Sequence, residues 1–324
     1  MKKLLTAIST YRTALMGIAI LGVMIGHCKT DWPVSIFSRT VGLLCYSVFT
    51  GGFLFLSGFG LYYSMSKNNS IKDFYAKRMK RVLVPWACIA LPYFLFMDVI
   101  HSGSWSNFLW HLSTLSFWKS GNYSGMWYIS VIMALYLVYP FYYRITYGNR
   151  KLKSCILLLI FGSLFIIEYM IFMLAPDYYD RISICMNMGI FFLGSYMADF
   201  LCNNRKDLII NVGGVILMCL IAAYFFKLSG HIYIIYNLFC IGLWAGLFRS
   251  VQNSKIGNVG IRVLEWFGRY TLELYMIHLF LYYIMKEVLL PGIGNNILFP
   301  VSVAIAMLMC MPIHNAINKL SRVL

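Results

Sequence analysis

The sequence predicts an all-helical membrane protein, a single bundle of about ten transmembrane helices formed by residues 1–324. Hydrophobic residues make up 60% of the chain, charged residues only 12%, and the mean hydropathy is +0.73. Soluble domains carry about 25% charged residues, so this composition indicates an integral membrane protein. A second observation is the series of apolar stretches, each near the roughly 20 residues that a bilayer-spanning helix needs. The third is the placement of the positive charges.

Short polar segments separate the stretches that we expect to span the membrane, which are 11–30, 37–65, 82–100, 126–147, 153–175, 183–203, 208–228, 232–250, 269–290 and 296–317. An even count puts both termini on one side. With the N-terminus inside, 21 of the 27 Lys and Arg lie on the inner side. This bias predicts that both termini are cytoplasmic. The same bias accounts for the net charge of +16, because the positive charges set the topology and attract anionic lipid. Binding to nucleic acid is not needed to explain this charge.

The start of the chain and the cysteines indicate neither a further domain nor a bound metal. Lys2 and Lys3 precede an apolar segment without a small-residue cleavage site, so we expect the first helix to be retained. No polar stretch is long enough for an appended soluble domain. The nine cysteines are dispersed, mostly in apolar runs, with no two within three residues of each other. They are interpreted as packing residues and not as a metal site or disulfide framework.

The first apolar stretch, YRTALMGIAILGVMIGHCK, carries Arg12 near its start and His27 near its end. Over fifteen residues a helix rises about 22 Å, so the two side chains lie at different membrane depths. An ionisable side chain inside a bilayer is costly unless it has a partner or a water-filled cavity, which makes His27 a functional candidate. The alternative is a helix-end histidine that reaches the interface.

The long inner loop ends in a cluster of cations within FYAKRMKRVLVPW. Lys77 and Arg81 are four residues apart and share one face of a helix. Together with Arg78 and Lys80 they can bind an anionic ligand such as a phosphate. Positive-inside anchoring is the alternative for each of them. The long outer loop, 101–125, is rich in Trp, Ser, Asn and His, which suits either interfacial anchoring or sugar stacking.

Polar residues inside the second and fifth stretches need a partner within the protein. The second stretch contains GGFLFLSGFG, in which the glycines and Ser57 allow neighbouring helices to approach closely. Glu168 in the fifth stretch is not expected to face lipid.

The ninth stretch, EWFGRYTLELYMIH, combines charged and aromatic residues. Arg269 and Glu273 are four residues apart and can simply pair with each other. A ligand that enters from the inner end meets Arg269 and Tyr270 first, and His278 about 14 Å deeper. His314, in the tenth stretch, is interpreted as a packing residue.

Five motifs occur in order along the chain: MGIAILGVMIGH, GGFLFLSGF, FYAKRMKRVLVPW, MWYI with YLVYP, and FGRYTLELYMIH. In motif, order and spacing the chain resembles the membrane acyltransferase-3 family over nearly its whole length. Members are bacterial integral-membrane enzymes that usually O-acetylate surface sugars. The resemblance implies that His27 is catalytic, as general base or acyl acceptor. The expected contacts to the acyl-CoA donor are Arg12, Lys77, Arg78, Arg81, Arg269 and Tyr270, and further candidate site residues are Ser57, Trp127, Tyr128, Glu273, Tyr275 and His278.

The chain departs from the family pattern at two places. The family's first helix usually carries an arginine ten residues before the histidine, and that position is Met16 here. Arg12 lies one turn earlier on the same helix face and can supply the missing cation. Gly125 and Met126 precede Trp127 where many relatives carry a histidine.

The expected function is transfer of an acyl group, most simply acetyl, from cytoplasmic acyl-CoA to a hydroxyl of a cell-envelope or exported glycan. The donor is a substrate, and no permanently bound cofactor or metal is expected. The expected partners are membrane lipid, acyl-CoA and a glycan or lipid-linked sugar, in a bacterial inner membrane. The alternatives are a lipid-linked glycan flippase or transporter, which would bind no acyl-CoA, and a glycan polymerase.

Overall fold

The computed structural model describes residues 2–28, 35–46, 48, 50–121, 127–182, 188–203, 208–226 and 231–323. Every regular element in these ranges is a helix. The first half contains α1 Lys2–Thr10, α2 Arg12–Cys28, α3 Ile36–Tyr46, α4 Thr50–Lys67, α5 Ile71–Arg78, α6 Val84–Phe94, α7 Trp105–Leu112, α8 Ser116–Ser120 and α9 Trp127–Thr146. The second half contains α10 Arg150–Leu174, α11 Pro176–Ile182, α12 Gly189–Asn203, α13 Leu208–Phe225, α14 Ile232–Val251, α15 Lys255–Arg269, α16 Thr271–Ile284 and α17 Asn295–Val323.

Within the described ranges, six helical segments are long and apolar enough to cross a membrane, which makes the chain a multi-pass membrane protein. They are Ile71–His101, Trp127–Thr146, Arg150–Leu174, Leu208–Phe225, Ile232–Val251 and Asn295–Ser321. A seventh results if α1 and α2, which are bent by 70°, form one broken span. All six correspond to predicted stretches. The count of ten and the cytoplasmic termini stay predictions, and the inner-side cations Arg205 and Lys206 lie outside the described residues.

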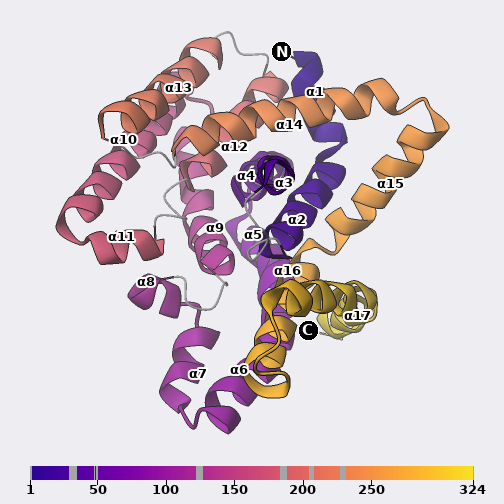
Figure 1. The fold of residues 1–324 in the computed structure, drawn as a ribbon. Helices are drawn as coiled ribbons and strands as arrows, with labels where there is room; N and C mark the ends of the chain where they lie inside the picture. The colour runs from indigo at the N-terminus through magenta and orange to yellow at the C-terminus, as the bar shows by residue number, and fades with distance from the viewer. Residues whose placement is uncertain are drawn as a thin grey trace.

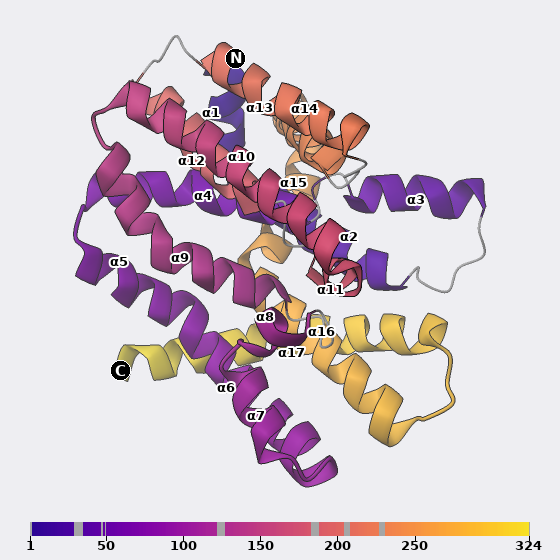
Figure 2. The same ribbon diagram turned by 90° about the vertical axis from the view of Figure 1, so that its left-hand side faces the viewer.

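The other four predicted stretches form shorter helices, and all of these except the exposed α3 lie inside the bundle. The stretch 37–65 is interrupted, because α3 ends at Tyr46 and α4 begins at Thr50. The stretches 11–30, 183–203 and 269–290 give α2, α12 and α16, of 17, 15 and 14 residues. In Figures 1 and 2, α2 and α4 lie between the layer of α10–α13 and the helices α15–α17. These interior helices carry most of the candidate site.

Glycines bring the interior helices into backbone contact, as predicted for the GGFLFLSGFG motif. A Cβ placed on Gly58 of α4 would lie 1.9 Å from the carbonyl oxygen of Phe191 in α12. A Cβ on Gly194 of α12 would lie 2.1 Å from the carbonyl oxygen of Phe55. Gly268 of α15 is equally close to α2, where its Cβ would lie 1.9 Å from the oxygen of Thr13. Small residues at such crossings permit the close packing that holds membrane helices together.

Buried charges away from the cavity are paired. Glu168, 2% exposed, lies 2.5 Å from His231 through their Oε2 and Nε2 atoms, so its predicted orientation away from lipid is confirmed. Lys153 Nζ of α10 lies 2.9 Å from Asp199 Oδ2 of α12. Each pair connects two helices inside the protein, because an unpaired charge there would cost several kcal/mol.

Candidate functional site

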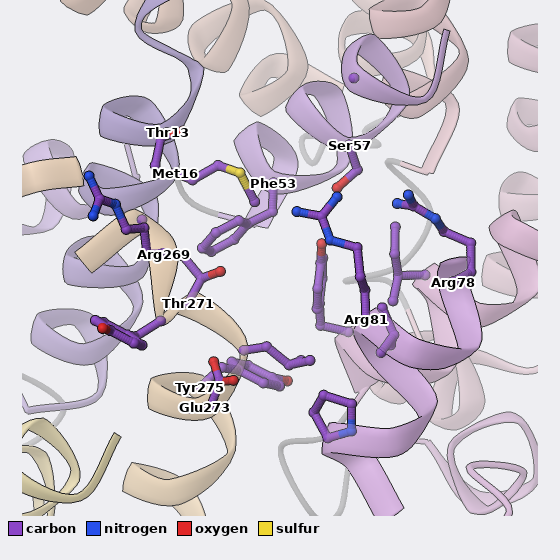
Figure 3. A pocket seen from close by; sticks show the side chains of 18 of the residues that line it. Thr13, Met16, Phe53, Ser57, Arg78, Arg81, Arg269, Thr271, Glu273 and Tyr275 are labelled. Carbon is purple, nitrogen blue, oxygen red and sulfur yellow. The ribbon is translucent and has the colours of Figure 1, made fainter. Parts of the chain in front are cut away.

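A cavity of about 620 Å³ lies between α2, α4, α5, α6, α9, α15, α16 and α17. Cations, hydroxyls and aromatic rings line it. The lining residues used below are Arg12, Met16, Val23, Phe53, Ser57, Gly60, Arg78, Lys80, Arg81, Tyr128, Ile132, Tyr136, Arg269, Tyr270, Glu273, Tyr275, His314 and Asn318. Figure 3 shows Arg78 and Arg81 on one side of the cavity and Arg269 on the other.

The cavity has two chemically different ends. On α9, Tyr136 lies 5.7 Å from the Arg78 guanidinium carbon at one end. Tyr128, about 12 Å along the same helix, contacts the rings of Phe53 and Tyr275 at 5.6 and 5.8 Å. On α2, Val23 lies about 16 Å beyond Arg12. We call Arg12, Arg78, Lys80, Arg81 and Arg269 the charged end, and Val23, Phe53, Tyr128 and Tyr275 the aromatic end.

Three guanidinium groups at the charged end have no carboxylate partner within the part of the chain that the structure describes. Arg12 Nη1 donates to the carbonyl oxygen of Leu56 at 3.1 Å. Gly60 provides the room, because a Cβ there would lie 2.1 Å from Arg12 Nη1. Arg78 packs against aromatic rings, and its buried Nε has no hydrogen-bond partner. Together with Arg81, these groups are close enough to repel one another, so an anionic ligand would stabilise them.

A π-helical turn, Met79–Leu83, follows α5 and decides which loop cations face the cavity. Arg78, Lys80 and Arg81 line it, whereas Lys77 is exposed and does not. The structure therefore brings three of the four cations to the cavity and leaves out Lys77, which was expected to contact the donor with them.

Two histidines form a hydrogen-bonded pair beyond the aromatic end. His278 is fully buried on α16, and its Nε2 lies 3.0 Å from Nδ1 of His27 on α2. His278 Nδ1 lies 2.6 Å from the carbonyl oxygen of Leu274. A carbonyl only accepts, so His278 Nδ1 carries the proton and its Nε2 accepts one from His27 Nδ1. In the neutral ring, Nε2 of His27 then holds the lone pair of a base or nucleophile.

Neither histidine lines the cavity, although both adjoin its aromatic end. His27 follows Val23 by one helical turn, and His278 follows Tyr275 by three residues, with ring centroids 6.4 Å apart. On the other side of His27 lies the ring of Phe299, at 5.7 Å. Side chains on a helix lean toward its N-terminus, and this direction points both imidazoles back toward the cavity.

The predicted pairing of Arg269 with Glu273 is not what the structure shows. Glu273 Oε1 accepts a hydrogen bond from Nδ1 of His314 at 2.6 Å, and Arg269 lies 4.0 Å from Glu265. His314 also makes an edge contact with Tyr270 at 5.1 Å. Its interpretation as packing alone therefore has to be corrected, since it faces the cavity and is the partner of a buried carboxylate.

Most of the predicted site residues come together, with a few exceptions. Ser57, Arg269, Tyr270, Glu273 and Tyr275 line the cavity beside the residues above, whereas Trp127 is buried outside it. Among the residues that sequence reasoning missed are Phe53, Tyr136 and Asn318, which look like ordinary helix residues. Lys80 was recognised as part of the cation cluster, and it lines the cavity. Gly125 and Met126 lie outside the described residues. No group of three or more His, Cys, Asp and Glu within the described ranges could hold a metal ion.

Residues 13–315 match the model of the acyltransferase-3 family, which is described as an acyltransferase domain. The matched region contains His27 and His278 and begins one residue after Arg12. No curated protein and no solved structure matches the chain.

Proposed function

The chain belongs to the acyltransferase-3 family, and from this membership we propose that it is an O-acyltransferase that uses acyl-CoA, most simply acetyl-CoA. The acceptor in this proposal is a hydroxyl group of a cell-envelope or exported glycan, and the enzyme lies in a bacterial inner membrane. Membership itself establishes an acyltransferase, and the helices establish a multi-pass membrane protein.

The observation that supports a CoA donor is the charged end of the cavity. Arg12, Arg78 and Arg81 line the cavity, and no carboxylate among the described residues pairs with them. Guanidinium groups match phosphate oxygens in charge and in fork geometry, and CoA carries several phosphates. The path along α2 from Arg12 to His27, about 22 Å, is similar to the reach of a CoA molecule from its phosphates to its thioester.

The histidine pair supplies the chemistry of transfer. Nε2 of His27 takes the proton of the acceptor hydroxyl while the hydroxyl oxygen bonds to the thioester carbonyl carbon. The carbon–sulfur bond then breaks, and the CoA thiolate leaves with the bonding electrons. His278 holds His27 in the tautomer that leaves Nε2 basic. The same nitrogen can instead attack the carbonyl and carry the acyl group before the hydroxyl receives it.

The test is transfer by purified protein in lipid, with radiolabelled acetyl-CoA and an envelope glycan. His27→Ala should reduce transfer by roughly 10²–10⁴-fold and leave acetyl-CoA binding intact, because His27 does not line the cavity. A matched control is His101→Ala, since His101 is exposed and lies outside the cavity. Appreciable transfer by His27→Ala would remove His27 from the mechanism.

The acceptor class is tested in cells that carry or lack the gene. Alkali-labile acetyl groups on envelope glycans should disappear with the gene, as measured by mass spectrometry. Unchanged glycan acetylation would contradict the proposed acceptor. A protein that binds no acyl-CoA and tolerates His27→Ala would be a transporter or polymerase instead.

A further inference from the structure

The aromatic end of the cavity is divided into two halves. Val23 and Tyr275 adjoin the histidine pair, through the helical turn from Val23 to His27 and the contact of Tyr275 with His278. Phe53 of α4 and Tyr128 of α9 form the other half, with ring centroids 5.6 Å apart. Tyr128 also contacts Tyr275, so the rings of Tyr128 and Phe53 are neighbours of the acyl group of a donor whose thioester lies beside Val23 and Tyr275.

The half away from the histidines is closed by bulky side chains. Phe53 is 5% exposed, and its ring lines the cavity in contact with Tyr128. Tyr128 contacts Tyr275, and Ile132, one turn further along α9, fills the adjacent wall. Packed interiors relax little around an added group, so a longer tail has no room unless one of these rings is removed.

We propose that Phe53 and Tyr128 determine the acyl-chain length of the donor and restrict transfer to short groups such as acetyl. This inference rests on the proposed acyl-CoA-dependent function. The length of acyl group that the enzyme accepts follows neither from the family match nor from the histidine pair. Each methylene group that lacks space lowers the rate of transfer by about tenfold or more. The rate of hexanoyl transfer should therefore be negligible beside that of acetyl transfer.

The experiment measures acetyl and hexanoyl transfer from their CoA thioesters by the same preparation and compares the ratio between variants. A ratio is insensitive to the fraction of folded protein. Wild type should prefer acetyl by at least about a hundredfold. Phe53→Ala should raise hexanoyl relative to acetyl transfer by at least about tenfold. Ser64→Ala is the matched control, because Ser64 lines the cavity on the same helix about 16 Å from Phe53, and its ratio should not change.

Each outcome decides a different question. If wild type transfers acetyl but Phe53→Ala leaves the ratio unchanged, or if wild type uses hexanoyl as readily as acetyl, the length restriction is wrong and the proposed function stands. If wild type transfers neither group and binds no acyl-CoA, the proposed function fails. Should Phe53→Ala not insert into the membrane, Phe53→Leu keeps more of the volume, and its ratio should shift in the same direction.

Discussion

At the scale of single residues, the unusual feature is a histidine oriented by another histidine. Carboxylates are the more frequent partners of catalytic imidazoles, but a neutral imidazole with a fixed tautomer serves as well. The carbonyl oxygen of Leu274 fixes His278, and His278 fixes His27. Sequence reasoning found both histidines and their depth. It could not find their contact, because they are 251 positions apart in the chain.

The first residue-scale prediction concerns His278 as a positioning residue. His278→Leu removes the acceptor for His27 Nδ1–H and should lower the transfer rate by about 10–100-fold. His278→Gln offers an amide oxygen near the position of Nε2 and should recover much of the rate. Rates at saturating acetyl-CoA and binding by calorimetry provide the measurement. Equal losses in both variants would indicate a purely structural role.

The second residue-scale prediction concerns Arg12 and Met16, which both line the cavity. Arg12→Ala should weaken donor binding by about 10–150-fold, because a hydrogen bond to a charged group contributes roughly 1.5–3 kcal/mol. The two positions lie on the same face of the helix, and the distance between them along the helix axis is about 6 Å. The double change Arg12→Ala with Met16→Arg should therefore restore much of the affinity in a calorimetric titration. An Arg12→Ala variant with full affinity would make Arg12 an ordinary membrane anchor.

At the scale of elements, the π-helical turn Met79–Leu83 determines the composition of the charged end. The cluster of cations could be recognised from sequence, since four lie within five residues. Their orientation could not, because nothing in KRMKRVL distinguishes a π-helical from an α-helical turn. The turn selects Arg78, Lys80 and Arg81 and leaves Lys77 facing outward.

The prediction from this turn is a contrast between neighbouring cations. Arg78→Ala and Arg81→Ala should each weaken acetyl-CoA binding by about 10–100-fold. Lys77→Ala, which removes a charge one residue from Arg78, should change the affinity less than about twofold. Isothermal calorimetry in detergent measures all three. If Lys77→Ala weakens binding as much as Arg78→Ala, the charges act through their overall field and not through contacts.

A second prediction at this scale concerns the crossing of α4 and α12. Gly58→Ala places a Cβ 1.9 Å from the backbone oxygen of Phe191, so the helices must separate. Overpacking of this kind costs about 1–3 kcal/mol and should lower the thermal midpoint. Gly213→Ala on α13 is the control, because its Cβ would meet nothing within 4 Å. Tryptophan fluorescence on heating compares the two, and equal midpoints would mean that the crossing adapts freely.

At the scale of the whole molecule, hydropathy predicted the helical class and the location of the long apolar helices, because lipid contact demands apolar side chains. It did not predict that the stretches which form α2, α4, α12 and α16 become short interior helices. Protein surrounds these helices, so glycines and polar residues can replace part of their apolar surface. The site lies on them for the same reason, since a cavity needs side chains that lipid does not tolerate.

The aromatic end has a consequence for the cell's energy supply. An enzyme that passes acyl groups across an energised membrane must not let ions follow them. The rings of Phe53, Tyr128 and Tyr275 line the end of the cavity next to the histidine pair, and an aromatic lining of this kind is poorly wetted. In the proposed reaction only a small uncharged acyl group reaches this end, while the charged part of the donor stays at the arginines. The ion gradient would then survive each turnover.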